Sequence, residues 1–405
     1  MDTGSLSPVK TSRRYIILDA LRGFALLGIC MANFPEFSLY TFLRPEAAAA
    51  FPSAGADRVM RFLLYFFVDG KFYTIFSLLF GIGFSIIISN AERKGVNGFR
   101  IFYRRMAVLV LIGFLHLMFI WSGDILMLYA LTGMLLPLFR KVSDRALLCW
   151  AAALLVIPVA VDTLCWVTGT YLSAPVVALQ QAICAKYGIT DGNFAYWLRD
   201  AQDYGSVFRF LLQGALVRVQ ELVDGNRYFK VLGLFLIGFY IGRKRIFADL
   251  DGRRRWLKKI FLCGTAAGLP LSAVYAWSCM QHHPLGLAVH SMLYLTSVYP
   301  LGFAYMSGIC LLYLKWKDLV LWRLLAAPGR MALTNYIGQS LIGMFLFYGI
   351  GLGLGASVGL VCTETAVLAV YAFQTVFSLC WLKFFRFGPL ERIWRMLTYG
   401  RFSRL

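Results

Sequence analysis

The chain contains few charged residues. Only 15% of its 405 residues are Asp, Glu, Lys or Arg, whereas 60% are hydrophobic. Soluble globular chains usually contain about a quarter charged residues, so a soluble fold of this length is excluded. Apolar runs of about 20 residues recur along the chain, and each is long enough to cross a hydrocarbon core of about 30 Å. The sequence therefore predicts an all-α polytopic integral membrane protein.

Sequence motifs for metal and nucleic acid are also missing. The nine cysteines lie mostly inside apolar runs, and because no CxxC pair or Cys/His cluster stands out, we expect neither a zinc site nor a disulfide framework. The net charge of +20 comes without a basic tail or a basic segment interleaved with aromatic residues, which argues against a nucleic-acid partner. We expect no metal cofactor, and the lipid bilayer as the main partner.

The apolar runs predict about ten transmembrane helices in a single membrane domain, residues 1–405, with a tail at 384–405. Most of the 40 Lys and Arg residues precede the first span, lie in every second connection, or lie in the tail. The positive-inside rule then places both termini in the cytoplasm. Two outer segments, 58–67 and 204–223, are expected to lie along the interface with arginine on the wet face. The predicted spans are 16–35, 71–90, 101–120, 124–139, 146–168, 228–243, 257–278, 287–314, 331–351 and 357–383.

Two stretches of the chain resemble each other. Residues 68–86 and 223–241 align without gaps and share ten of nineteen residues. One interpretation is a parallel repeat of the kind found in some transporters. The other is that two helices share an entry turn and a glycine-containing packing face.

Ionisable groups inside spans are costly and are functional candidates by default. The candidates at one depth near the outer face are Asn33, Asp69, Lys71, His116 and Asp124. A neutral His116 ring oriented by Asp124 or Asp69 could act as a general base, and Lys71 could stabilise an oxyanion. The plainer alternative makes Asp124 a helix cap, Trp121 an interface anchor and His116 a core histidine.

Glu364 is predicted to lie about 10 Å deep on the outer side, at 1.5 Å of rise per residue. This depth exceeds what a helix cap needs. A proton carrier, a distant partner for His116 and a carboxylate paired with a neighbouring helix all remain open for it.

A second polar layer lies toward the cytoplasmic side. Asp19 and Arg22 are three positions apart on one helical face, so they could pair with each other, or Arg22 could reach a phosphate. On the ninth span Asn335 and Gln339 share a face, as do Tyr336 and Ser340. Gln374 on the tenth span lies somewhat deeper on the same side of the membrane. The alternative role for these amides is hydrogen bonding between helices.

Four stretches together carry a resemblance. They are "RYIILDALRGFALLGICMAN" (14–33), "HLMFIWSGDILMLYALTGMLLP" (116–137), "GRMALTNYIGQS" (329–340) and "FGPLERIWRMLTYG" (387–400). In order and spacing they resemble the YeiB-like bacterial membrane proteins, catalogued as domain of unknown function 418. That family looks like a distant relative of membrane acyltransferases, with which it shares an Asp-x-x-Arg-Gly sequence, here Asp19, Arg22 and Gly23. The resemblance implies a bacterial cytoplasmic (inner) membrane protein.

The resemblance also implies a reaction and shows one departure. Acyltransferase relatives take acyl-CoA from the cytoplasm and pass the acyl group to an acceptor on the far side. Their catalytic histidine follows the arginine after ten residues, where this chain has Asn33. We therefore expect His116 to supply the base, Arg22, Asn335, Tyr336 and Gln339 to line an acyl-CoA cavity, and Arg104 and Arg105 to meet its phosphates.

The expected donor substrate is acyl-CoA, acetyl-CoA being the simplest, and the expected acceptor is a small molecule or glycan with a hydroxyl or amine. The alternative function is a transporter or flippase for an amphipathic solute or a lipid-linked sugar. Association into a homo-oligomer stays open.

Overall fold

The computed structural model describes residues 16–93 and 95–399. The N-terminal residues 1–15 and the end of the tail, on which part of the predicted topology rests, lie outside the described residues. Within the described ranges every regular element is a helix, as the apolar runs predict.

Among residues 16–93 and 95–399, seven helical stretches are long and apolar enough to cross a membrane. Their outward faces are apolar as well, since Leu164, Val167, Phe373 and Val376 are each more than half exposed. A surface of this kind fits a lipid environment. The seven stretches are α1 (Ile16–Phe37), α3 to α4 (Ala54–Leu63, Lys71–Arg93) through the π-helical η3 (Leu64–Val68), α5 (Gly98–Phe119), α7 (Asp144–Thr168), α12 (Arg254–Met280), α13 to α14 (Gly286–Leu293, Tyr299–Lys315) through the π-helical η6 (Tyr294–Val298), and α17 (Leu360–Phe384).

Three of the ten predicted spans are helical but shorter. They are α6 (Leu126–Gly133) with η4 (Leu136–Phe139), α11 (Arg227–Arg243) and α16 (Ala332–Phe347). α11 has 17 residues and α16 has 16, which gives each an axial length of about 25 Å. The structure therefore supports seven membrane-spanning stretches in the described residues, and the full count of ten spans remains a prediction.

The two resembling stretches form helices that pack against each other. α4 and α11 make the most extensive helix pair in the described chain. A Cβ atom added at Gly81 would lie 2.1 Å from the Phe235 carbonyl oxygen, and one at Gly238 would lie 2.1 Å from the Leu78 carbonyl oxygen. Only glycine permits this approach. In the alignment of the two stretches, however, Gly238 pairs with Gly83, which has open space around it, and Gly81 pairs with Leu236. The close approach therefore does not decide between a repeat and a shared packing face.

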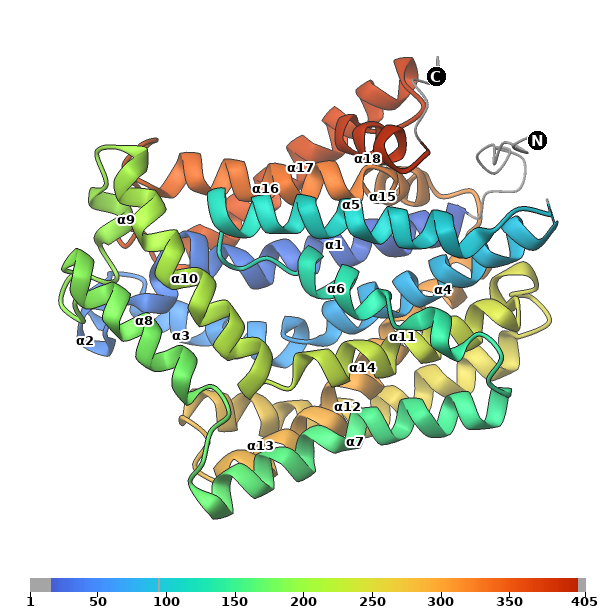
Figure 1. The fold of residues 1–405 in the computed structure, drawn as a ribbon, viewed down its shortest axis with the longest axis horizontal. Coiled ribbons are helices and arrows are strands. Elements are labelled where there is room, and N and C mark those ends of the chain that lie inside the picture. The colour runs from blue at the N-terminus through green and yellow to red at the C-terminus, as the bar shows by residue number, and fades with distance from the viewer. Residues whose placement is uncertain (1–15, 94, 400–405) are drawn as a thin grey trace.

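The long helices run roughly parallel, so the molecule has two ends (Figure 1). We call the end formed by α2 (Pro45–Ala49), α8 (Ala174–Tyr187) and α9 (Trp197–Asp200) the loop end. The opposite end, where residues 140–143 and 244–253 connect helices, is the basic end. The short helices α15 (Val320–Arg330) and α18 (Pro389–Tyr399) lie toward it.

The segment predicted as the second interfacial helix is α10 (Tyr204–Asp224). Arg209 is exposed, as expected for a wet face, but Arg218 is not. Its side chain is 8% exposed, donates to the Ser122 carbonyl oxygen at 3.0 Å and pairs with Glu221 at 2.7 Å. The prediction that arginine lies on the wet face is therefore wrong for Arg218, because α10 packs over the turn between α5 and α6.

Candidate functional site

The turn between α5 and α6 brings a histidine and a carboxylate together inside the bundle. α5 carries His116 in its last turn, and the backbone reverses through residues 120–125 before α6 begins. The backbone N–H groups of Ile120 and Trp121 both donate to the His116 carbonyl oxygen, at 3.0 and 2.9 Å. This closes the turn tightly enough for Asp124 to reach the imidazole. His116 and Asp124 are 1% and 3% exposed.

Both nitrogens of the His116 ring have partners. Nδ1 lies 2.9 Å from Asp124 Oδ1, and Nε2 lies 2.9 Å from the hydroxyl oxygen of Ser340 on α16. The other Asp124 oxygen accepts the backbone N–H of Met127 at 2.8 Å. The two roles proposed for Asp124, helix cap and histidine partner, are thus filled together by its two oxygens.

The partners fix the histidine tautomer. An ionised carboxylate can only accept, so Asp124 holds the proton of a neutral imidazole on Nδ1. Nε2 is then left as an acceptor for the Ser340 hydroxyl at 2.9 Å, and the Tyr336 carbonyl oxygen, at 3.4 Å, is a second and longer acceptor for the same hydroxyl. This order, carboxylate to imidazole to hydroxyl, is the arrangement that activates a serine for nucleophilic attack.

Aromatic rings enclose the Ser340–His116–Asp124 chain. The Tyr336 ring lies 5.3 Å from the His116 ring, and the Trp121 ring lies 6.2 Å from it. Trp121 is 2% exposed and packs on Phe37 at 4.4 Å. It is therefore a buried neighbour of the histidine and not an anchor at the membrane surface.

Asp69 and Lys71 do not join His116. Asp69 accepts a hydrogen bond from Tyr275 on α12, and Lys71 donates to the Tyr65 carbonyl oxygen at 2.6 Å. The Lys71 ammonium also lies 5.0 Å from the centre of the Tyr275 ring. The alternative in which Asp69 orients His116 is wrong. Two residues predicted at the same depth can lie on different sides of the helix bundle, and Asp69 faces Tyr275. Asn33 is half-buried on α1.

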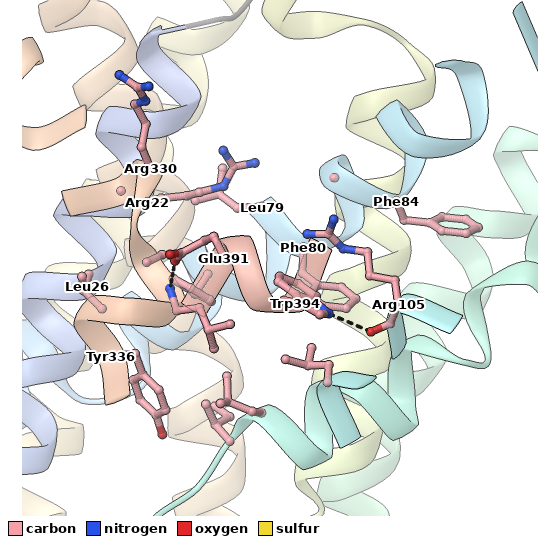
Figure 2. A pocket seen from close by; sticks show the side chains of 18 of the residues that line it. Arg22, Leu26, Leu79, Phe80, Phe84, Arg105, Arg330, Tyr336, Glu391 and Trp394 are labelled. Carbon is pink, nitrogen blue, oxygen red and sulfur yellow. Dashed lines mark hydrogen bonds between the residues drawn. The ribbon is translucent and has the colours of Figure 1, made fainter. Parts of the chain in front are cut away.

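A cavity of about 300 Å³ extends from the basic end toward His116. Its deep part is apolar, and Tyr336 and Ile125 lie in its lining at that end. Figure 2 shows Tyr336 at the opposite side of the cavity from Arg22 and Arg330. Since the same tyrosine ring contacts His116, the cavity ends one residue short of the Ser340–His116–Asp124 chain.

The other end of the cavity is strongly basic. The arginines in its lining are Arg22, Arg105, Arg330 and Arg395, from α1, α5, α15 and α18. Arg22 pairs with Asp19 at 2.7 Å, one of the two predicted alternatives. Arg105 stacks on Trp394 at 3.7 Å, and the indole N–H donates to the Arg105 carbonyl oxygen at 2.9 Å (Figure 2). Arg104, predicted to act with Arg105, is exposed and is not among the lining residues of this cavity.

Two glycines set the position of Arg22. A Cβ atom at Gly23 would lie 1.9 Å from the Leu325 carbonyl oxygen, and one at Gly329 would lie 1.9 Å from the Asp19 carbonyl oxygen. α1 and α15 therefore touch backbone to backbone. The glycine of the Asp-x-x-Arg-Gly sequence brings Arg22 beside Arg330 at the mouth of the cavity.

Glu391 ties α18 to the start of α16. Its carboxylate accepts the backbone N–H groups of Leu333 and Thr334 at 2.7 and 3.0 Å and the Thr334 hydroxyl at 2.6 Å. These are the unpaired donors of a helix N-terminus. Burial raises the pKa of Glu391, and the hydrogen bonds from Thr334 and Leu333 oppose that rise. The contact holds the cavity mouth to the helix that carries Ser340.

The predicted amides form a network between α16 and α17. Asn335 donates to the Ser378 hydroxyl at 2.9 Å, Gln339 donates to Gln374 at 3.0 Å, and Gln374 donates to the Asn335 carbonyl oxygen at 2.8 Å. These contacts match the alternative of hydrogen bonding between helices. Of the predicted cavity residues on α16, Tyr336 lines the cavity, whereas Asn335 and Gln339 turn to α17.

Glu364 is isolated from these groups. It is 3% exposed, and in the described part of the chain neither of its carboxylate oxygens has a hydrogen-bond partner. His116 is not its partner, since both imidazole nitrogens are engaged elsewhere. A buried carboxylate in this state is costly when ionised.

Three residues of the site were not predicted as functional. The spacing of Ser340 and Tyr336 placed them on one helix face, but nothing in the sequence connected Ser340 to His116. Arg330 and Arg395 lie in segments expected to be cytoplasmic, where basic residues are ordinary. The fold of α18 back onto α5 is what gives Arg395 its place.

Comparison with known proteins gives relatives over the whole length. A family profile described as "Protein of unknown function (DUF418)" matches residues 241–401. The chain is 32% identical to the uncharacterized protein YxaH of Bacillus subtilis over 407 residues, covering 98% of this chain and 96% of that protein. It is 30% identical to an uncharacterized 39.9 kDa protein in the amylase 3′ region of Bacillus acidopullulyticus, with 98% and 97% covered. It is 29% identical to the uncharacterized protein YeiB of Escherichia coli over 413 residues, with 95% and 96% covered. No solved structure matches it.

Proposed function

This chain belongs to the YeiB-like DUF418 family, and we propose that it is a membrane acyltransferase that works through an acyl-serine. The observation that carries the proposal is the buried chain of hydrogen bonds from Asp124 through His116 to Ser340. The basic cavity that ends at Tyr336 supports acyl-CoA as the donor.

The donor fits the two halves of the cavity. The phosphates of coenzyme A would bind to the arginines at the mouth, Arg105 and Arg395 among them. One guanidinium group can donate two parallel hydrogen bonds to two oxygens of a phosphate. The acyl end would lie in the apolar part beside Tyr336. Ser340 is 1% exposed, so the Tyr336 side chain must move before a thioester carbonyl can reach the serine.

The first half-reaction transfers the acyl group to the enzyme. The Ser340 hydroxyl attacks the thioester carbonyl and gives its proton to His116 Nε2, while Asp124 stabilises the resulting imidazolium. The carbon–sulfur bond breaks, and coenzyme A leaves as a thiol with that proton. In the second half-reaction an acceptor hydroxyl or amine gives a proton to His116, attacks the serine ester, and Ser340 recovers its proton.

Purified protein in lipid nanodiscs, incubated with acetyl-CoA labelled in the acetyl group, tests the proposal. We expect a stable adduct on the peptide that contains Ser340, found by intact mass and peptide mapping, and release of free coenzyme A. Protein that neither binds acetyl-CoA nor releases coenzyme A would refute the acyltransferase.

Transport is the second candidate, and Glu364 is the observation that favours it. A buried carboxylate without hydrogen-bond partners in the described residues is the kind of group that carries protons through transporters. Uptake of a labelled solute by proteoliposomes in the absence of acyl-CoA, lost in Glu364→Gln and kept in Ser340→Ala, would favour transport over acyl transfer.

The direction of transfer rests on the predicted topology. We propose that the chain has ten spans in the bacterial inner membrane, with both termini and the basic end in the cytoplasm, where acyl-CoA is made. The acceptor would then approach from the loop end. A green fluorescent protein fused to the C-terminus should fluoresce and an alkaline phosphatase fused there should be inactive; the reverse pattern would contradict the topology.

A further inference from the structure

A second cavity, of about 630 Å³, lies at the loop end, apart from the Ser340–His116–Asp124 chain. Its walls include η3, the end of α12, the turn between α12 and α13, and residues of α1, α3, α13 and α17. Among its lining residues are Tyr65, Asp69, Tyr275, Cys279, His283 and His290. None of them takes part in the proposed acyl transfer, and among them only Asp69 was a candidate in the sequence analysis.

Three of these side chains converge. Cys279, His283 and His290 each offer one ligand atom, and the three atoms lie within 4.8 Å of one another. The two imidazole rings are 3.9 Å apart between their centres. A turn between two helices does not need one thiol and two imidazoles close together in order to fold.

The backbone of the turn is unusual at the point that produces this convergence. His282 and His283 have φ angles of 56° and 59°, a left-handed conformation that residues with side chains seldom adopt. The His283 backbone N–H donates to the Ser278 carbonyl oxygen at 2.8 Å. The turn therefore brings the His283 ring back toward the end of α12, where Cys279 lies.

The histidine rings also have unused nitrogens. Nδ1 of His283 and Nδ1 of His290 are buried, and neither has a hydrogen-bond partner within the described ranges. A buried polar atom without a hydrogen-bond partner destabilises the folded state. A ligand bound by both Nδ1 atoms would supply the missing partner to each ring.

We propose that Cys279, His283 and His290 bind a zinc ion. One thiolate with two imidazoles is a donor set that suits Zn²⁺, with ligand distances of about 2.0–2.3 Å. The present separations require the side chains to close in by about 1 Å on binding. Three protein ligands leave a fourth position of a tetrahedral ion for water or a substrate, and all three residues line the cavity.

Neighbouring groups are arranged as supports for such an ion. The Tyr275 ring stacks on His290 at 5.2 Å between centres, and its hydroxyl donates to Asp69. Asp69 supplies negative charge beside a cation, and groups of this second layer typically change metal affinity 10-fold to 100-fold. Asp69, which the sequence analysis grouped with His116, would thus belong to the zinc site.

Titration of the purified full-length protein in detergent with Co²⁺ and then Zn²⁺, after treatment with a chelator, tests the proposal. We expect one Co²⁺ per chain, a thiolate-to-cobalt charge-transfer band in the near ultraviolet, and displacement by Zn²⁺. Cys279→Ser should abolish the band, and His283→Asn should weaken binding more than about 100-fold, beyond the effect of a supporting residue.

His282→Asn is the matched control, because it makes the same substitution at a neighbouring position with the same backbone conformation. Equal losses in His282→Asn and His283→Asn, or the lack of a stoichiometric cobalt site, would overturn the proposal. A measurement on the unmodified chain guards against misfolded variants: Zn²⁺ should slow alkylation of Cys279 and leave the half-buried Cys165 unchanged. Equal alkylation of Cys279 with and without Zn²⁺ would also overturn it.

Discussion

Replacement of Ser340 by alanine separates an acyl-serine mechanism from direct transfer. The substitution removes one oxygen from a site that is 1% exposed, so the packing volume is almost unchanged. His116 Nε2 loses the partner that now lies at 2.9 Å. A buried acceptor left unpaired costs about 1–3 kcal/mol of stability. The variant should therefore still fold, and its thermal midpoint should fall by a few degrees only.

The effect on catalysis should be far larger. Loss of the nucleophile from a Ser–His–Asp unit lowers kcat by about 10⁶-fold in a soluble protease, and we expect a loss of at least about 10⁴-fold here. If His116 instead took the proton directly from the acceptor, Ser340 would only orient the ring. The loss would then be about 10-fold, which is the scale of one neutral hydrogen bond.

The assay is release of coenzyme A from acetyl-CoA in nanodiscs, together with mass spectrometry of the Ser340 peptide. Ser378→Ala is the matched control, since Ser378 is also buried on a facing helix and accepts one hydrogen bond, from Asn335. A Ser340→Ala enzyme that keeps a tenth of its activity would refute the acyl-serine. So would equal losses in Ser340→Ala and Ser378→Ala.

Three further predictions address the histidine partner, the cavity mouth and the α16 cap. Asp124→Asn should lower kcat by about 10⁴-fold with little change in KM, because an amide can donate to Nδ1 and favour the wrong tautomer of His116; steady-state kinetics measures both constants. Arg105→Ala should raise the KM for acetyl-CoA about 10-fold with kcat kept, a change expected from one lost charged contact, whereas the exposed Arg104→Ala should change neither constant. Because burial raises the pKa of Glu391, the folded state holds its proton at a pH where the unfolded state has lost it, so stability should fall as the pH rises from about 4.3 through the raised value. Thermal midpoints measured across that range should show the fall in the wild type and a smaller one in Glu391→Gln.

The sequence predicted the features that depend on local order. Long apolar runs located the helices to within a few residues, since hydropathy and helical length follow directly from composition. The pairing of His116 with Asp124 was also within reach, because only eight residues and one tight turn separate them. The choice between Asp124 and Asp69 was not, and it required the contacts around Tyr275.

The remaining parts of the site depend on how helices face one another. Hydropathy predicts the depth of a residue in the membrane but not its direction around the bundle. Lys71 and His116 were predicted to share a depth, yet they have different partners. Ser340 comes from a helix 224 residues further along the chain, and serines in spans are common as simple links between helices. The packing of α18 against α5 through Trp394 likewise cannot be predicted from composition.

The position of the Ser340–His116–Asp124 chain bears on how a group could cross the membrane without an open pore. Toward the loop end the site is closed by packed rings: Phe37 lies 4.4 Å from Trp121, and Phe34 lies 6.1 Å from Phe347. Toward the basic end Tyr336 stands between the cavity and His116. A reaction in which donor and acceptor met together would need both barriers open at once. A serine ester removes this need, because the donor can leave on one side before the acceptor enters on the other, and each barrier opens in its own half-reaction.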